Sequence, residues 1–182
     1  MAMPEESRRV KYTKTVLRQA LLDLLKTTPF DQITVTKLCG EADVARGTFY
    51  LHYDDTADLL ADIEDSVLDM FESHLQAKDA TATPQDYWTL VLTGLASQRD
   101  LLALLFSIPQ GRLVGRCLAL NRAYSTDRCR AKYPDLSDEM IDYMQTFLEQ
   151  GSASLIVHWI SQGCTVPIGE LADLLSQLNE GT

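Results

Sequence analysis

The segment TVTKLCGEADVARGTFYLHY, residues 34–53, constrains the fold more than any other stretch of this chain. Thr34 can cap a short helix that runs through Ala42, because its hydroxyl can accept a hydrogen bond from a backbone N–H of the first turn. Asp43 suits a tight turn, since Asp tolerates the left-handed backbone conformation. A second short helix is predicted over residues 46–53. Two helices joined in this way form a helix-turn-helix.

The preceding stretch, residues 11–28, supplies a third helix on which this motif can bury its back. Apolar side chains recur there at helical spacing, and Pro29 ends the pattern. The apolar residues of the motif are spaced to pack on Leu17, Leu21 and Leu24; they are Leu38, Ala42, Val44, Phe49 and Tyr53. The residues left outside are Thr36, Lys37, Arg46, Gly47, Thr48, Tyr50 and His52. Small residues and hydrogen-bond donors suit contact with DNA phosphates and base edges in the major groove.

Charge is divided unevenly along the chain. The net charge of −10 argues by itself against a nucleic-acid partner. Residues 1–53, however, carry eight Lys or Arg against six Asp or Glu, whereas residues 54–182 carry eight against twenty. Phosphate contacts act over about a Debye length, ~8 Å, so a local positive surface is sufficient. The basic stretch at residues 8–14 therefore indicates a DNA-binding N-terminal part, and the acidic remainder indicates a different task.

The remainder has helical periodicity almost throughout and no clear alternating strand pattern. Helices are expected over residues 55–77, 85–98, 100–107, 112–133, 138–162 and 170–179, separated by Pro, Gly or polar breaks. We therefore predict an all-α protein with two domains. Residues 1–53 form a three-helix DNA-binding domain with the helix-turn-helix and a basic N-terminal arm, and residues 54–182 form a second helical domain.

The pattern T-V-x-x-L-x-x-x-A-x-V-x-R-G-T-F-Y-x-H-Y, followed by D-L-L, resembles that of the TetR/AcrR family of bacterial transcriptional regulators. The resemblance covers about residues 11–60, and R-G-T-F-Y-x-H-Y is its most specific part. Farther on, Gly151, Trp159 and Gly163 resemble the C-terminal half of one subgroup. This implies a DNA-binding regulator whose second domain binds ligand and dimerises.

The same resemblance implies roles for the outward residues. Phosphate contacts are implied for Tyr50 and His52, base contacts for Arg46, Gly47 and Thr48, and contacts from the preceding helix for Thr36 and Lys37. The chain departs from the family pattern at three positions. Ala45 replaces a capping Ser or Thr, at a cost of ~1 kcal/mol; Asp43 replaces the usual turn Gly; and Thr56 replaces a Lys that often anchors phosphate. The Thr56 hydroxyl can still contact a phosphate.

For the second domain, the resemblance implies a ligand pocket and a dimer surface. The pocket candidates mix apolar walls with a few polar groups, as ligand sites do: Met70, His74, Tyr87, Trp88, Val91, Phe106, Cys117, Asn121, Tyr124 and Tyr143. The dimer surface is expected on the last two helices, through Phe147, Gly151, Leu155, His158, Trp159, Leu171, Leu174, Leu175 and Leu178. Core packing within one subunit is the alternative for both sets.

Other classes find less support in the sequence. Four cysteines, at positions 39, 117, 129 and 164, form no C-x-x-C pair, so neither a disulfide framework nor a metal site is expected. We find no catalytic motif and no cofactor motif, so an enzyme is the least favoured class. No long apolar run or N-terminal leader is evident, and we expect a cytoplasmic protein without membrane contact.

We therefore expect a homodimeric regulator that binds a palindromic double-stranded operator, with repression controlled by a small-molecule effector. A TetR-like co-regulator whose second domain binds a protein partner is the alternative. The sequence leaves the effector, the operator and the sign of regulation open.

Overall fold

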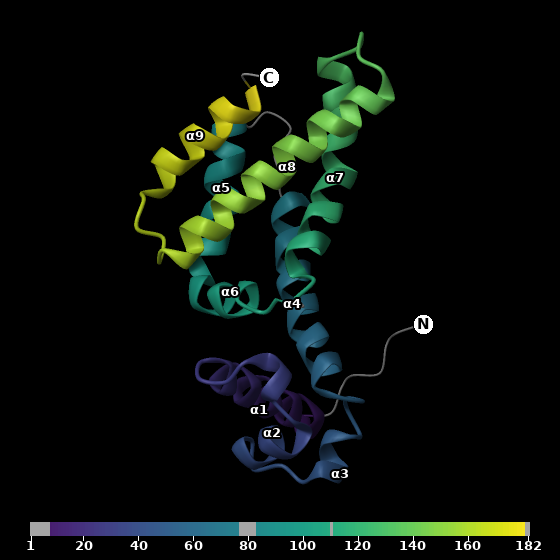
Figure 1. The fold of residues 1–182 in the computed structure, drawn as a ribbon, viewed down its shortest axis with the longest axis vertical. Coiled ribbons are helices and arrows are strands. Elements are labelled where there is room, and N and C mark those ends of the chain that lie inside the picture. The colour runs from purple at the N-terminus through teal and green to yellow at the C-terminus, as the bar shows by residue number, and fades with distance from the viewer. Residues whose placement is uncertain (1–7, 77–82, 110, 181–182) are drawn as a thin grey trace. The chain divides into compact units, whose positions relative to one another are not determined.

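The structure is a computed structural model that describes residues 8–76, 83–109 and 111–180, apart from the side chains of residues 74–76, 123–125, 127–128 and 180. All regular elements in this part are helices (Figure 1): α1 (Arg8–Leu25), the 3-10 helix η1 (Phe30–Gln32), α2 (Val35–Glu41), α3 (Arg46–Phe49), α4 (Thr56–Gln76), α5 (Pro84–Ser97), α6 (Arg99–Phe106), α7 (Leu113–Lys132), α8 (Asp138–Ser161) and α9 (Ile168–Glu180). The prediction of an all-α protein is confirmed.

The chain divides into two compact units, Met1–Val67, which we call the head, and Leu68–Thr182, which we call the body. The division falls inside α4, later than the expected boundary at residue 53. The cause is that Leu59, Leu60 and Ile63, in the first half of α4, are buried and complete the core of the head. The first half of α4 therefore belongs to the head, and the second half belongs to the body.

The head is built around the predicted helical core. Leu17 and Leu21 of α1, Leu38 of α2 and Phe49 of α3 are fully buried, and Tyr53 is nearly so. Each large apolar side chain removed from water contributes ~1.5–3 kcal/mol to folding. The two short helices of the motif are therefore held by burial of these side chains, with α2 packed against α1 and α3, rather than by their own helical propensity, which is weak at seven and four residues.

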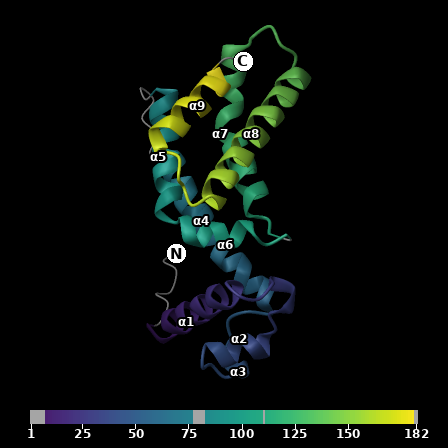
Figure 2. The ribbon, with the colours of Figure 1, turned by 60° about the vertical axis from the view of Figure 1, so that its left-hand side comes forward.

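Two pairs of long helices organise the body. α5 packs along α9 and α7 packs along α8, as both ribbon views show (Figure 2), while α6 packs against α8. Its core is formed by Val91, Leu92, Leu102, Leu105, Leu113, Ile141, Trp159, Ile160, Leu171, Ala172 and Leu175. A capping box at Thr83 and Asp86 begins α5, and Ser137 caps α8 by accepting from the Met140 N–H.

The turn between α8 and α9 is held by a side chain as well as by backbone geometry. Gly163 and Cys164 both have positive φ, at 74° and 57°. The indole N–H of Trp159 donates to the Val166 carbonyl oxygen at 2.9 Å, so this buried ring fixes the loop that places α9. Among the described residues, no single helix is long and apolar enough to cross a membrane; only α5 and α6 taken together, bent by 83°, pass that test of length and composition.

Candidate nucleic-acid interface

The first helix of the motif forms as its local sequence predicts. The Thr34 hydroxyl accepts a hydrogen bond from the Lys37 N–H at 3.2 Å and caps α2. Asp43 adopts a left-handed φ of 50°, which turns the chain, and the Val44 N–H donates to the Cys39 carbonyl oxygen across the turn. Both predictions, the cap and the turn residue, are confirmed.

The second helix is shorter than predicted. α3 ends at Phe49, whereas the expectation was a helix to Tyr53. Residues 50–53 continue as a turn, with the N–H groups of His52 and Tyr53 both donating to the Phe49 carbonyl oxygen. The chain must reverse here to enter α4, whose first turn is capped by the Asp55 carboxylate, which accepts from the N–H groups of Ala57 and Asp58 at 2.8 Å.

The predicted DNA-binding residues lie on the outside of the head. Thr36, Lys37, Arg46, Gly47 and Tyr50 are exposed. Thr48, His52 and Thr56 are half-buried, so these three present only part of their side chains to a partner. Their neighbours Leu38 and Phe49 are fully buried. The motif therefore separates an apolar inner side from an outer side that carries donors and a glycine.

Two cationic residues, Lys37 and Arg46, lie on this outer side. The Lys37 ammonium donates to the Thr28 hydroxyl at 3.0 Å. A hydrogen bond with Tyr50 raises the pKa of Arg46 above its ordinary value, so this guanidinium stays charged. Cys39 lies beneath, where burial raises the pKa of its thiol and keeps it neutral, although the Arg46 charge opposes the shift.

The basic stretch before the motif is helical. α1 begins at Arg8, and Arg8, Arg9 and Lys11 are exposed along its first turns. The sequence predicts a basic N-terminal arm here, of which residues 1–7 lie outside the described part of the chain. The structure shows these charges on a helix in the described residues, where the helical backbone limits how far they can reach.

A polar cluster that sequence reasoning missed joins three segments of the head. Asp62 of α4 accepts hydrogen bonds from Arg18 of α1 at 2.7 Å and from the Tyr53 hydroxyl at 2.6 Å. Burial would raise the pKa of Asp62, but the hydrogen bonds from Arg18 and Tyr53 outweigh it and lower the pKa. Burial, with the hydrogen bond to Asp62, raises the pKa of Tyr53 well above its ordinary value. The only sequence signal was Tyr53 itself, because a buried Tyr hydroxyl needs a partner.

The ligand-pocket candidates are distributed unevenly in the body. Six of them are half-buried: Met70, Tyr87, Trp88, Phe106, Cys117 and Asn121. Val91 is buried in the core, whereas Tyr143 is 63% exposed, which makes it unsuitable as a pocket wall within one subunit. The side chains of His74 and Tyr124 lie outside the described residues. The Tyr87 hydroxyl donates to the Asn121 side-chain oxygen at 3.0 Å, so two of the candidates are brought together across α5 and α7.

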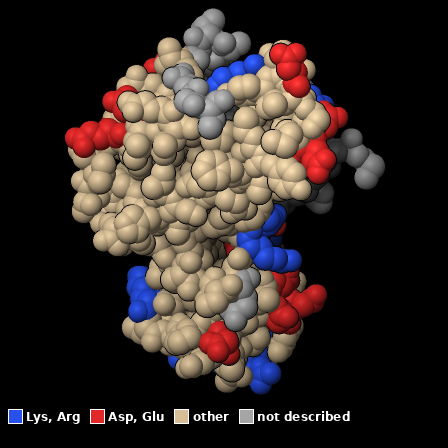
Figure 3. Space-filling view, turned by 45° about the horizontal axis from the view of Figure 1, so that its top comes forward, with Lys and Arg blue, Asp and Glu red and all other residues tan. Residues whose placement is uncertain are grey.

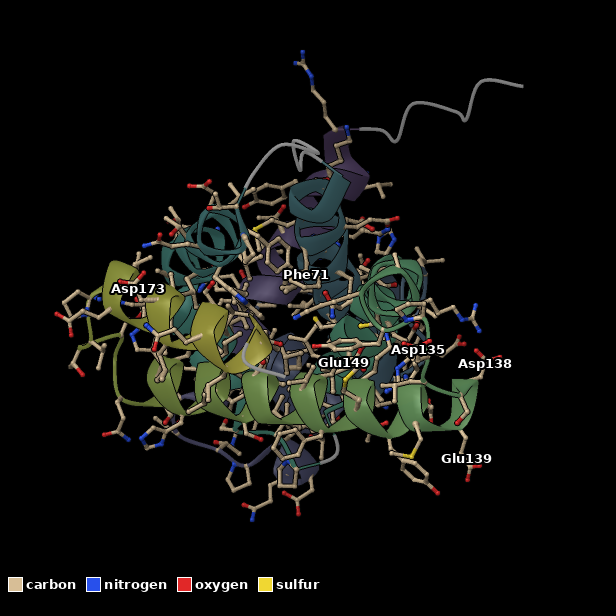
Figure 4. All side chains as sticks on the ribbon, turned by 90° about the horizontal axis from the view of Figure 1, so that it is seen from above. Phe71, Asp135, Asp138, Glu139, Glu149 and Asp173 are labelled. Atoms are coloured by element: carbon tan, nitrogen blue, oxygen red, sulfur yellow. The ribbon has the colours of Figure 1, made fainter. Side chains whose placement is uncertain are left out.

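Beside these residues, α7 and α8 share a polar seam. Arg122 donates to Glu149 at 2.9 Å, to Asp142 at 3.0 Å and to Thr146 at 2.9 Å. The Glu149 carboxylate is largely buried and projects from α8 toward the inside of the body, whereas Asp138 and Glu139 lie at the end of the helix (Figure 4). Sequence reasoning did not select Arg122 or Glu149, because each reads as an ordinary surface charge on its own.

The dimer candidates separate into two groups. Trp159, Leu171 and Leu175 are buried inside the subunit, so they are not available to a partner and this part of the prediction is corrected. Leu155 is half-buried. The residues on the surface are Phe147, Gly151, His158, Leu174 and Leu178, joined by Met140 and Tyr143, which were not assigned to this face. The physical reason is that α8 is apolar on two sides, and periodicity cannot tell which side faces the core.

The exposed residues of α8 form a continuous apolar stripe. Met140, Tyr143, Phe147 and Gly151 recur at spacings of three and four, which places them on one side of the helix. Phe147 is 73% exposed. In the body, the face visible in Figure 3 has charged side chains scattered around a broad uncharged area. An exposed apolar stripe such as that of α8 marks an interaction surface.

Comparison with known proteins gives a consistent result. Residues 82–181 match a sequence family described as a transcriptional regulator C-terminal region. No curated protein matches the chain. Among solved structures, a TetR transcriptional regulator from Streptococcus agalactiae 2603V superposes with a TM-score of 0.72 at 22% identity, covering 94% of this chain and 95% of that one.

Two further structures share the fold at lower identity. FadR from Bacillus subtilis, solved in complex with stearoyl-CoA, has a TM-score of 0.63 and 16% identity over 92% of this chain and 98% of that chain. The dihydroxyacetone kinase operon activator DhaS has a TM-score of 0.60 and 18% identity over 93% and 94%. At these identities the likeness establishes a common fold.

Proposed function

Since this chain belongs to the TetR family of transcriptional regulators, we propose that it binds a palindromic operator as a homodimer and that an effector held in its body controls this binding. Family membership places the protein among regulators rather than enzymes. The observation that carries the DNA-binding part of the proposal is the two-sided motif, with Phe49 fully buried and Arg46, Gly47 and Tyr50 exposed on the same short segment.

The residue types on this surface support a division of labour. Tyr50, His52, Lys37, Thr36 and Thr56 offer hydroxyl, imidazole and ammonium donors, which suit phosphate oxygens and set the position of the head on the duplex. Arg46 and Thr48 can reach base edges, where a bidentate Arg contact to guanine is the commonest specific interaction.

Gly47 contributes by its lack of a side chain. A Cβ placed at Gly47 meets no atom within 4 Å, so packing inside the protein does not require a glycine here. We infer that Gly47 serves contact with DNA, because a helix without a side chain at this point can lie closer to the major groove.

The apolar stripe on α8 and the exposed leucines of α9 support the homodimer. A second copy would cover Phe147, Tyr143, Leu174 and Leu178 and exclude water from them. A two-fold interface presents the same patch from each subunit, so two heads would meet two half-sites of opposite orientation. Half-site centres are expected about one helical turn, ~34 Å, or a multiple of it apart.

Control by an effector is the least constrained part of the proposal. The half-buried set around Tyr87 and Asn121 mixes aromatic walls with polar groups, as ligand sites do. α4 is shared in sequence by head and body, so it is the element through which an effector could alter the separation of the heads. Coupling of this kind requires an effector that prefers one of the two states, typically by ~1–3 kcal/mol.

Two of the proteins with a similar fold illustrate alternatives for the kind of effector and for repression or activation. One was solved with stearoyl-CoA, and another is described as an operon activator. We propose repression released by a small effector as the leading case. A body that binds a protein partner is the second candidate, favoured by the extent of its exposed apolar stripe.

The decisive test is selection of bound sequences from random DNA with the purified full chain at stated salt concentration. We expect an enriched palindrome. Compounds that raise the melting temperature are then tested for their effect on operator affinity. If a compound binds the body and leaves operator affinity unchanged within about twofold, effector control is refuted and the protein-partner candidate takes its place.

A further inference from the structure

We propose that Leu51 is a specificity-determining residue that recognises a thymine methyl group in the major groove. This inference deepens the proposed function and rests on it. The starting observation is that Leu51, the residue between the two predicted phosphate ligands Tyr50 and His52, is 79% exposed. It is the most exposed of the large apolar residues in the described part of the chain.

The position of Leu51 on its segment follows from the backbone. Residues 50–53 form a turn after α3 whose hydrogen bonds still run three or four residues back, as in a helix, with the Leu51 N–H donating to the Thr48 carbonyl oxygen at 3.3 Å and the Tyr53 N–H to the Phe49 carbonyl oxygen at 3.0 Å. Successive helical residues are separated by ~100°. Leu51 therefore lies about one turn after Gly47, on the side opposite the fully buried Phe49.

This geometry places an apolar side chain next to the open position at Gly47. A Cβ at Gly47 would meet nothing within 4 Å, so the surface is unobstructed at this point. The polar residues Arg46 and Tyr50 lie on the same segment and are both exposed. On the side of the segment that would face DNA, Leu51 and Gly47 therefore form an apolar centre, and the hydrogen-bond donors Arg46 and Tyr50 lie beside it.

The major groove offers one apolar group for such a centre to contact. The C5-methyl group of thymine projects into the groove, and apolar side chains recognise it by contact. Phosphates and the donor and acceptor edges of other bases give Leu51 nothing to bind. An exposed leucine at the centre of the presented surface therefore selects for thymine, while Arg46 is free to read a guanine beside it.

The test uses the operator obtained by selection and replaces its thymines one at a time with deoxyuridine. This removes only the methyl group and keeps the base pair. At one thymine in each half-site, we expect wild-type affinity to fall about fourfold, which corresponds to the ~0.8 kcal/mol of one buried methyl group. Leu51→Ala should bind the thymine and uracil forms of that site equally, and Leu51→Met should retain part of the preference.

Leu136→Ala provides the matched control, because Leu136 is also an exposed leucine, at 39%, and belongs to the body. It should show the wild-type preference for thymine. If Leu51→Ala keeps the full thymine preference, or if the wild-type protein tolerates every deoxyuridine substitution, the inference is overturned while the proposed function stands. If selection enriches no sequence at all, the proposed function fails and this inference fails with it.

Discussion

The Tyr53 hydroxyl and the Asp62 carboxylate are joined by a 2.6 Å hydrogen bond, and the same Asp62 oxygen accepts from Arg18 at 2.7 Å. Tyr53 is the last residue of the turn that follows α3, Asp62 lies on α4, and Arg18 lies on α1. One carboxylate therefore ties the end of the DNA-binding motif to the helix that continues into the body. We infer that the head moves as one unit with the first half of α4.

The first prediction concerns the stability of this connection. Asp62→Asn should lower the free energy of unfolding by about 1–3 kcal/mol, because it weakens two hydrogen bonds to a charged group that is only partly exposed. Urea denaturation followed by circular dichroism measures the change. Asp69→Asn, at an exposed position on the same helix, is the control and should change stability by less than about 0.5 kcal/mol. Equal effects from the two variants would contradict the assignment.

The second prediction is the pH dependence of the same contribution. The pKa of Asp62 is lowered in the folded state, so the unfolded chain binds the proton more readily. The stabilisation is therefore fully present above the ordinary Asp pKa of ~3.9 and is lost as pH falls through the lower folded value. The stability difference between wild type and Asp62→Asn should be constant from pH 7 to 5 and shrink below about pH 4. A difference that does not shrink at all below pH 4 would show that charge is not its source.

A third prediction addresses the cap of α3. Ala45 lies in an extended conformation at the N-cap and makes no side-chain capping bond. Ala45→Ser should stabilise the protein by ~1 kcal/mol, because its hydroxyl can accept from a backbone N–H of the first turn. Thr34→Ala, which removes the existing cap of α2, should destabilise by a similar amount. Thermal unfolding of both variants gives the two signs, and a destabilised Ala45→Ser would show that this turn cannot accommodate the cap.

The fourth prediction separates phosphate from base contacts. Tyr50→Phe and Lys37→Ala should weaken binding to operator and random DNA alike, and Lys37→Ala should reduce the slope of log affinity against log salt by about 1. Arg46→Ala and Thr48→Ala should instead relax preference at particular base pairs, by ~1–3 kcal/mol each. Fluorescence titration against operator and scrambled duplexes at several salt concentrations distinguishes them. Uniform losses from all four variants would refute the division.

The fifth prediction concerns the dimer. Phe147→Glu should give a monomer of unchanged helicity, because it places a charge at the centre of the exposed stripe on α8. Light scattering at micromolar concentration measures the mass. Leu90→Glu adds the same charge at an exposed apolar position of α5 and should leave the dimer intact. Trp159→Glu is unsuitable for this purpose, since Trp159 is buried and its loss would unfold the turn that it holds. A dimeric Phe147→Glu protein would move the interface elsewhere.

Local sequence determined the parts of this protein that depend on a few neighbouring residues. Thr34 caps the helix that it was expected to cap, Asp43 makes the predicted turn, and all regular elements of the described residues are helices. These features follow from hydrogen bonds and backbone preferences that act within one helical turn. The R-G-T-F-Y-x-H-Y motif can be recognised from the sequence for the same reason, because its residues are close together in the chain.

Only the tertiary structure decided which side of each helix is inside. Trp159 and Phe147 both lie on α8 and read alike in the sequence, but the first is 3% and the second 73% exposed. Arg18 and Asp62 are 44 residues apart and looked like unrelated surface charges until folding brought them to one oxygen. Burial and ion pairing depend on which helices meet, and that choice is set by contacts between residues far apart in the sequence, so no local pattern contains it.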